Sequence, residues 1–182
     1  MTGTEPTASP TVPAPTAAPT PSGAPDAWAV AAAVPDPELP MLTLAELGVL
    51  AEVESDGSAV TAWLTPTYSG CPAIAEMAAD VDARLRAAGF GDVRVRLRLD
   101  PPWSTDRITE AGRRKLAEAG IAPPGPAGPP LLRLGPTRHL VVVCPQCGGR
   151  DTEELSRFGS TACKALWRCR DCREPFERIK EI

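Results

Sequence analysis

Two pairs of cysteines near the end of the chain constrain its fold more than any other feature. The pairs are Cys144-x-x-Cys147 and Cys169-x-x-Cys172, and 21 residues, positions 148–168, separate them. Two short turns of this kind can present four thiolates tetrahedrally, which is the geometry of a zinc ribbon. The same four thiolates also suit iron, so the pattern favours zinc and leaves iron as the alternative. A redox dithiol is disfavoured, because two glycines follow the first pair where a thioredoxin-type pair opens a helix.

The metal in such a site is expected to be structural. Four thiolates leave no open coordination position for a reactant. The cysteine-rich region is also too short to bury much core, and a structural zinc can contribute about 10–16 kcal/mol toward its folding. Two nearby residues are not needed as ligands. His139 is expected to be an ordinary strand residue, and Cys163 is either a small buried side chain or a functional thiol.

Proline-rich stretches divide the chain into four parts. Residues 1–25 are rich in Pro, Ala and Thr, cannot build a core, and are expected to form a disordered tail. Residues 122–136 begin with the run APPGPAGPP and are expected to form a semi-rigid linker. Two structured units remain, a larger one at 26–121 and the cysteine-rich ribbon at 137–182.

The hydrophobic pattern of residues 26–121 changes its period along the chain and predicts a small α+β domain. The expected elements are a helix at 26–34, strands at 48–54 and 59–66 joined by a tight turn at Asp56-Gly57, a helix at 71–88, a strand at 92–100, and a helix from about 104 to 119. We therefore expect an α-β-β-α-β order plus a final helix, with the helices on one face of the sheet. A small β zinc ribbon follows this domain.

Cys71 and a ladder of arginines are the features of this domain that could carry chemistry. Cys71 precedes Pro72 at the expected start of the 71–88 helix, where free N–H groups and the helix dipole would favour a thiolate. A buried structural cysteine is the alternative. The strand at 92–100 alternates between two sets of residues: Val93, Val95, Leu97 and Leu99, and Arg94, Arg96 and Arg98. The apolar set is expected to be buried, and the arginines to be solvated rather than phosphate-binding.

Charge and hydropathy argue against membrane and nucleic-acid roles. The N-terminal stretch has no basic region followed by an apolar one, and no segment is long and apolar enough to span a membrane. A cytoplasmic protein is therefore expected, and a reducing compartment makes paired cysteines metal ligands rather than disulfides. Residues 138–182 carry nine bases against seven acids, which is too balanced for a nucleic-acid-binding ribbon.

Several stretches carry a resemblance to a known family. The runs VPDPELPMLTLAELGVL, TPTYSGCPAI and PPWSTDRITEAGRRKLAEAGIAPP resemble domains of the MIP18/SufT type, whose fold is similar to that of iron–sulfur cluster assembly domains. With the cysteine-rich tail added, the order of motifs resembles the D subunits of the phenylacetyl-CoA epoxidase system of aerobic phenylacetate catabolism. The resemblance covers about residues 28–182.

The resemblance implies an accessory role in that multicomponent oxygenase. The role would be maturation, or delivery of iron or an iron–sulfur cluster, with the oxygenase and reductase subunits as partners and a second copy of the chain as a further candidate. By matching motif positions, the resemblance points to Cys71 and Cys163 as residues that handle iron or a cluster in transit, with Asp36 and Glu38 flanking them.

A stoichiometric structural subunit of the epoxidase is the alternative role. The sequence contains no catalytic acid–base pair, nucleotide-binding loop or flavin motif, so we do not expect the isolated chain to be an enzyme. Two positions depart from the family's pattern. Glu46 stands where an aspartate is expected, and Arg107 stands where an aromatic residue is common.

Overall fold

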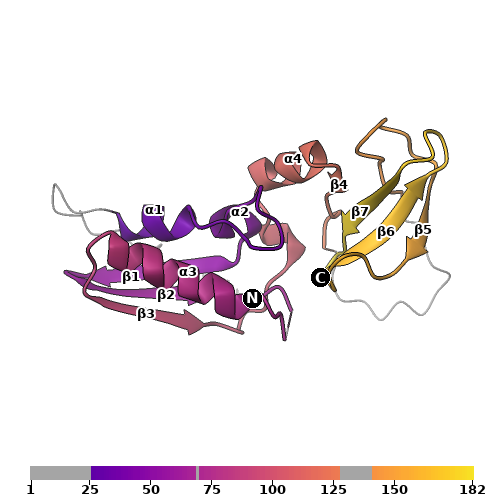
Figure 1. Cartoon of the computed structure of the whole chain (residues 1–182). Helices are drawn as coiled ribbons and strands as arrows, with labels where there is room; N and C mark the ends of the chain where they lie inside the picture. Colours follow the sequence, from indigo (N-terminus) through magenta and orange to yellow (C-terminus); the bar gives the residue numbers. More distant parts are fainter. Residues whose placement is uncertain (1–25, 69, 128–140) are drawn as a thin grey trace, which may run out of the picture.

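The computed structural model describes residues 26–68, 70–127 and 141–182, which form two units side by side (Figure 1). The helices are α1 (Ala27–Ala32), α2 (Leu44–Leu47), α3 (Ile74–Ala87) and α4 (Glu110–Glu118), with a 3-10 turn η1 (Thr105–Arg107). The strands are β1 (Leu50–Asp56), β2 (Ala59–Leu64), β3 (Asp92–Leu97), β4 (Ile121–Ala122), β5 (Thr152–Ser156), β6 (Lys164–Cys169) and β7 (Pro175–Ile179). The expected α+β domain and β ribbon are confirmed. The predicted tail at 1–25 and His139 lie outside the described residues.

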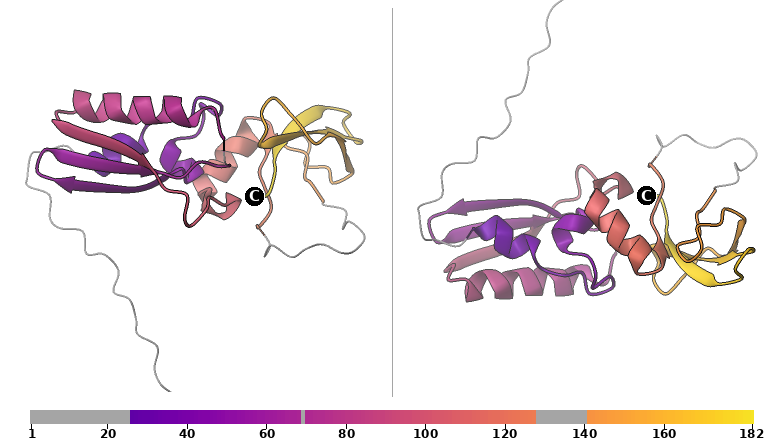
Figure 2. Two further views of the ribbon diagram at one scale, coloured as in Figure 1. Left: turned by 90° about the horizontal axis from the view of Figure 1, so that it is seen from below. Right: turned by 90° about the horizontal axis from the view of Figure 1, so that it is seen from above.

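The larger unit is a three-stranded sheet with helices on one face (Figures 1 and 2). β1 and β2 form the expected antiparallel hairpin, but its two-residue turn is Gly57-Ser58 rather than Asp56-Gly57, because Asp56 still pairs with Ala59. Gly57 supplies the positive φ of 59° that the turn requires. α3 then carries the chain back across the sheet, so that β3 pairs with β2 in parallel. Side chains that alternate along β2 and recur at helical spacing in α3 form the core between them: Val60, Ala62, Leu64, Met77, Val81 and Leu85.

The strand at 92–100 is shorter and less covered than its alternation predicts. β3 ends at Leu97, and although Val93 is buried, Leu97 is 50% exposed and Leu99 65% exposed. The expectation that both leucines are buried is therefore wrong. Alternation identifies the two faces of a strand, but it does not say how far the covering helices extend.

The open face of the sheet accounts for the arginine ladder. The guanidinium groups of Arg96 and Arg98 lie 5.7 and 4.9 Å from the centre of the Trp63 ring, and Arg98 also pairs with Glu52 at 2.7 Å. Arg94 pairs with an aspartate of its own strand. The ladder thus covers an indole and neutralises neighbouring acids, which are surface roles.

The two departures from the family's pattern both lie where helices meet the sheet. Glu46 completes a capping box with Thr43 at the start of α2, and its carboxylate pairs with Lys115 of α4 at 2.7 Å. Arg107 packs so closely against Gly48 that a side chain there would collide with it, and it donates a long hydrogen bond to the Thr65 hydroxyl at 3.5 Å. Both residues therefore connect elements of the larger unit.

The smaller unit shares a sheet with the larger one. Its strand order is β4-β7-β6-β5, and β4, which directly follows α4, pairs in parallel with β7 (Figure 1). Ile179 at the end of β7 is buried in the core of the larger unit, and the backbone N–H of Thr105 donates to the carbonyl of Ile182 at 3.2 Å. Ala122 belongs to this shared sheet, although composition makes it the first residue of a linker. The division of the chain at 121/122 stays a prediction.

Within the described residues, none of the helices combines the length and the apolar character that crossing a membrane requires.

Candidate metal centre and thiol pocket

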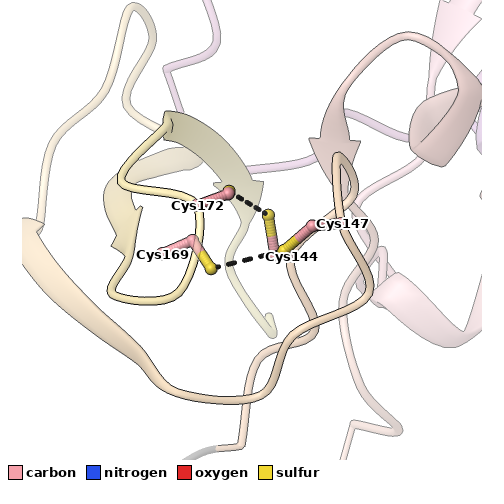
Figure 3. A group of neighbouring side chains, drawn as sticks. All are labelled: Cys144, Cys147, Cys169 and Cys172. Carbon is pink, nitrogen blue, oxygen red and sulfur yellow. Dashed lines mark hydrogen bonds between the residues drawn. The ribbon is translucent and has the colours of Figure 1, made fainter.

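The four paired cysteines converge in the smaller unit (Figure 3). Their sulfur atoms all lie within 4.8 Å of one another, with Cys144 Sγ 3.8 Å from Cys172 Sγ and Cys147 Sγ 3.6 Å from Cys169 Sγ. A tetrahedron of thiolates around zinc, with Zn–S bonds of about 2.3 Å, has S···S edges of about 3.8 Å. The arrangement therefore fits one tetrahedral metal ion held by four sulfurs.

Two tight turns bring these sulfurs together. In the first, Cys144 N donates to the carbonyl of Gly149 and Gly148 N donates to the carbonyl of Cys144, while Gly148 adopts a φ of 74°. In the second, β6 ends at Cys169, whose N–H donates to the carbonyl of Glu174 at 3.0 Å. Each turn thus presents its two cysteines to the other turn.

The electrostatics of the cluster favour a bound cation. The pKa of the Cys169 thiol is lowered, chiefly by the backbone N–H of Cys172. The pKa of Cys172 is raised to about 12: the Glu174 N–H lowers it, but burial and the three neighbouring sulfurs raise it by more. Four thiolates this close repel one another, so a cation among them is what makes the fully deprotonated cluster stable.

The four residues expected to handle iron or a cluster all line one pocket between the two units. Asp36, Glu38 and Cys71 come from the larger unit, and Cys163 comes from the ribbon, directly before β6. The cavity they line has a volume of about 20 Å³. We call this cavity the thiol pocket. Residues that lie up to 127 positions apart, from Asp36 to Cys163, are therefore brought together by the docking of the ribbon.

Asp36 is held in place by the backbone of the loop between α1 and α2. Its Oδ1 atom accepts hydrogen bonds from the N–H groups of Glu38 at 2.8 Å and Leu39 at 2.7 Å. The residue is only 2% exposed, and burial raises the pKa of its carboxyl group above the usual value. A charged carboxylate in this position is therefore costly to the fold.

Cys71 lies before α3 rather than in its first turn, so the expectation that it starts the helix is wrong. α3 begins at Ile74, and the N–H of Cys71 already donates to the carbonyl of Tyr68 at 3.2 Å. Pro72 lies in the turn between Cys71 and the start of α3. The Cys71 side chain is 6% exposed and packs in the core at the edge of the thiol pocket.

Cys163 is the ribbon's contribution to the pocket. It is half-buried, its Sγ lies 3.0 Å from the hydroxyl of Thr161, and burial raises the pKa of its thiol. The next residue, Lys164, is only 4% exposed, and its ammonium group lies 3.3 Å from Glu177. All six cysteines of the chain are free.

Seven further residues complete the lining of the pocket, and the sequence analysis placed none of them there. Trp103 is 5% exposed and its indole N–H donates to the carbonyl of Leu47 at 3.1 Å. Ile179 and Ile182 close the side formed by the ribbon. The apolar residues of β7 were a detectable signal of burial, but nothing local indicates that the end of this strand enters the other unit.

The thiol pocket differs from the four-cysteine centre in one respect. Within residues 26–68, 70–127 and 141–182, the ribbon cysteines form the only group of three or more potential ligands with atoms this close together. The thiol pocket thus places ligand-type side chains around a cavity without closing them into a finished metal site. A metal ion in this cavity would be bound by few of these side chains unless they moved toward it.

Replacing Asp36 by asparagine should stabilise the protein in a pH-dependent way. Asparagine keeps an oxygen that can accept from the amides of Glu38 and Leu39, and removes the buried charge. Because burial raises the folded-state pKa of Asp36 above its unfolded value, ionisation costs nothing below the unfolded pKa and its full cost above the folded pKa. Melting curves from pH 3 to 8 should show equal stability at the acid end and a more stable Asp36→Asn variant at neutral pH.

The matched control for that measurement is Asp80→Asn, on the exposed side of α3. This substitution should shift the melting temperature little, because the side chain is exposed. A difference between Asp36→Asn and the parent protein that did not change with pH would contradict the assignment of a buried charge.

Comparisons with known proteins agree with this two-unit organisation. The family described as "PaaD zinc beta ribbon domain" matches residues 133–180, and the family described as "Iron-sulfur cluster assembly protein" matches residues 26–102. A protein of Escherichia coli (strain K12), described as the D subunit of a "Putative 1,2-phenylacetyl-CoA epoxidase", is 44% identical over 155 residues, which cover 85% of this chain and 91% of the relative.

Two solved structures are similar to half of the chain. A domain of unknown function, DUF59, from Bacillus anthracis has a TM-score of 0.46 and 28% identity, and covers 50% of this chain and 87% of its own. A conserved hypothetical protein from Thermotoga maritima has a TM-score of 0.43 and 28% identity, and covers 50% of this chain and 90% of its own.

Proposed function

Because the chain belongs to the family of 1,2-phenylacetyl-CoA epoxidase D subunits, we propose that it is an accessory protein of such an epoxidase and acts in the maturation of its metal centres. In this role it would hold iron, or an iron–sulfur cluster, and pass it to the oxygenase or reductase subunits. The free thiols of all six cysteines are consistent with work in the reducing cytoplasm.

The observation that carries this proposal is the composition of the thiol pocket. Two cysteines and two carboxylates, all of them potential metal ligands, surround one small cavity at the junction of the two units. Their ligand atoms are not closed into a finished site, in contrast to the four ribbon cysteines. A carrier must bind its cargo and also release it, and an unfinished ligand set suits that requirement better than a closed one.

The four-cysteine centre has a different part in the proposal. We propose zinc as its metal, with iron as the alternative, because the description of the matching family names zinc and the S···S distances fit zinc. Four sulfur ligands leave no position for a reactant. The metal therefore holds the ribbon together, and with it Cys163 at the pocket.

A stoichiometric structural subunit is the second candidate role, since the E. coli relative is described as a subunit. The two roles differ in when the protein is needed. A maturation factor is needed before the oxygenase turns over, whereas a structural subunit stays bound at fixed stoichiometry during turnover.

Replacing Cys71 by serine should separate these roles. In cells that carry Cys71→Ser, the oxygenase should accumulate with roughly tenfold less iron in its metal centres, because altering even a group that only orients a metal ligand typically costs about 10–100-fold in affinity, and Cys71 would be a ligand itself. The variant itself should remain folded and keep its ribbon metal, since Cys71 is not among the four clustered cysteines. The measurement is the metal content and activity of the purified oxygenase.

Ala73→Ser is the matched control, because it adds a hydroxyl to an equally buried residue of the same turn and keeps the thiol. Oxygenase from those cells should be fully loaded. Adding parent protein to an oxygenase that is already mature should not change its activity. Normal metal content in cells with Cys71→Ser would remove this thiol from maturation and favour the structural subunit.

A further inference from the structure

We propose that the thiol pocket takes a single divalent metal ion, ferrous iron in its biological role, and not a preassembled iron–sulfur cluster. This inference rests on the proposed function, since it names the cargo of the same site. Four observations carry it: the size of the cavity, the kinds of ligand around it, the balance of charge, and a carboxylate oxygen of a buried residue that makes no hydrogen bond with the described residues.

The size of the cavity limits what it can bind to about one or two particles the size of a water molecule. Its volume is about 20 Å³, and a single water molecule needs roughly 10–15 Å³ measured in this way. A metal ion with one water molecule fits that space. A cluster with two irons and two sulfides does not fit unless the walls move, and Leu39, Met77 and Trp103 in those walls are almost fully buried in the packed core.

The ligands are of mixed type. Iron–sulfur clusters are typically held by four cysteine thiolates, whereas this pocket offers two thiols and two carboxyl groups. Carboxylate oxygens are hard ligands that suit single ions such as manganese and magnesium, and thiolates are soft ligands. A mixed set of this kind suits a divalent ion of intermediate softness, which is the character of ferrous iron.

The charge around the cavity favours a cation. Asp36 and Glu38 face it together with the two thiols, which become negative when they bind a metal. The nearby cation is Lys164. Its ammonium group already lies 3.3 Å from the carboxylate of Glu177 and donates to the Ser160 hydroxyl at 3.1 Å. Lys164 is therefore already paired, and a metal cation bound in the pocket would neutralise the negative groups that face it.

The second carboxylate oxygen of Asp36 supplies an independent sign of a ligand. Oδ1 accepts two backbone hydrogen bonds, but among the described residues no hydrogen bond involves Oδ2. The residue is only 2% exposed, and it lines the cavity. A carboxylate oxygen of a buried residue needs a donor or a cation beside it, and a metal ion in the pocket would meet that need.

Anaerobic titration of the zinc-loaded full-length protein with ferrous iron tests the inference. We expect one iron per chain in addition to the ribbon zinc, with a sulfur-to-iron charge-transfer band. That band should be lost in Cys71→Ser and weakened in Cys163→Ser, while the zinc content stays unchanged. In Asp36→Asn, which keeps both thiols, iron should bind at least about tenfold more weakly. Asp80→Asn should bind as the parent protein does.

A second arm offers the protein a [2Fe–2S] cluster on a donor protein. We expect no transfer, and neither visible cluster absorption nor acid-labile sulfide in the recovered chain. Uptake of two irons and two sulfides that depends on Cys71 would overturn the single-ion cargo and leave the maturation role standing. Iron binding that Cys71→Ser and Asp36→Asn leave unchanged would overturn the site itself. One iron bound at the pocket, with full loading of the oxygenase in Cys71→Ser cells, would support the single-ion site and contradict the maturation role.

Discussion

Removing the metal from the four-cysteine centre is expected to unfold residues 141–182 and to open the thiol pocket, while the sheet of β1, β2 and β3 stays folded. The ribbon buries only a small core of its own, around Trp167 and Phe176. A structural zinc contributes about 10–16 kcal/mol, which matches or exceeds the entire stability of a typical domain, about 5–15 kcal/mol. Without it, the ribbon should lose its fold and withdraw Cys163 and Ile179 from the pocket.

Hydrogen exchange and thiol alkylation, both read by mass spectrometry, measure this result. After chelation, the amides of β6 should exchange rapidly, and Cys71, 6% exposed in the folded protein, should react with iodoacetamide. The amides of α3 should exchange faster than before, because Ile179 leaves their core, but far more slowly than those of β6. Adding zinc back should reverse all three changes. Cys169→Ser should reproduce the effect of chelation, and Cys163→Ser, on the same segment but outside the metal cluster, should not. A ribbon that stays protected without metal would show that its apolar core suffices.

Local patterns in the sequence predicted most of the larger unit. The Asp56-Gly57 pair between two β-rich runs indicates the hairpin to within one residue, because only a few residue types tolerate the positive φ that Gly57 supplies to the turn. The spacing of the paired cysteines likewise indicated the metal centre, because tetrahedral coordination needs four donors from two short turns. In both cases the chemistry of neighbouring residues determines the structure.

The thiol pocket could not be derived from local patterns. A resemblance points to Asp36 and Glu38, and position in the sequence also points to Cys71 and Cys163. Nothing local to any of them indicates that they share one cavity. What joins them is the pairing of β4 with β7, and β4 has only two residues, too few for any alternation to be visible. Lys164 was overlooked for a related reason, since a lysine is usually exposed and its burial depends on a partner in another strand.

Shortening Ile179 to alanine is expected to destabilise the larger unit, although this residue ends a strand of the ribbon. Its side chain is 3% exposed and belongs to the same core as Leu47 and Met77. Replacing a buried isoleucine by alanine typically costs about 2–5 kcal/mol, because the contacts are lost and a cavity remains. Part of that cost should appear as faster exchange of the α3 amides, which lie about 100 positions earlier in the chain.

Ile182→Ala is the matched control, because the same side chain three residues later is 43% exposed and only its backbone carbonyl bonds to Thr105. A surface change of this kind typically stays within about 0.5 kcal/mol. If Ile179→Ala loosened the ribbon alone and left the α3 amides as protected as before, the two units would be independent domains joined by a linker, as composition suggests. If both loosen together, the ribbon is a structural part of the larger unit, and its metal, through β6 and β7, also sets the position of Cys163 at the thiol pocket.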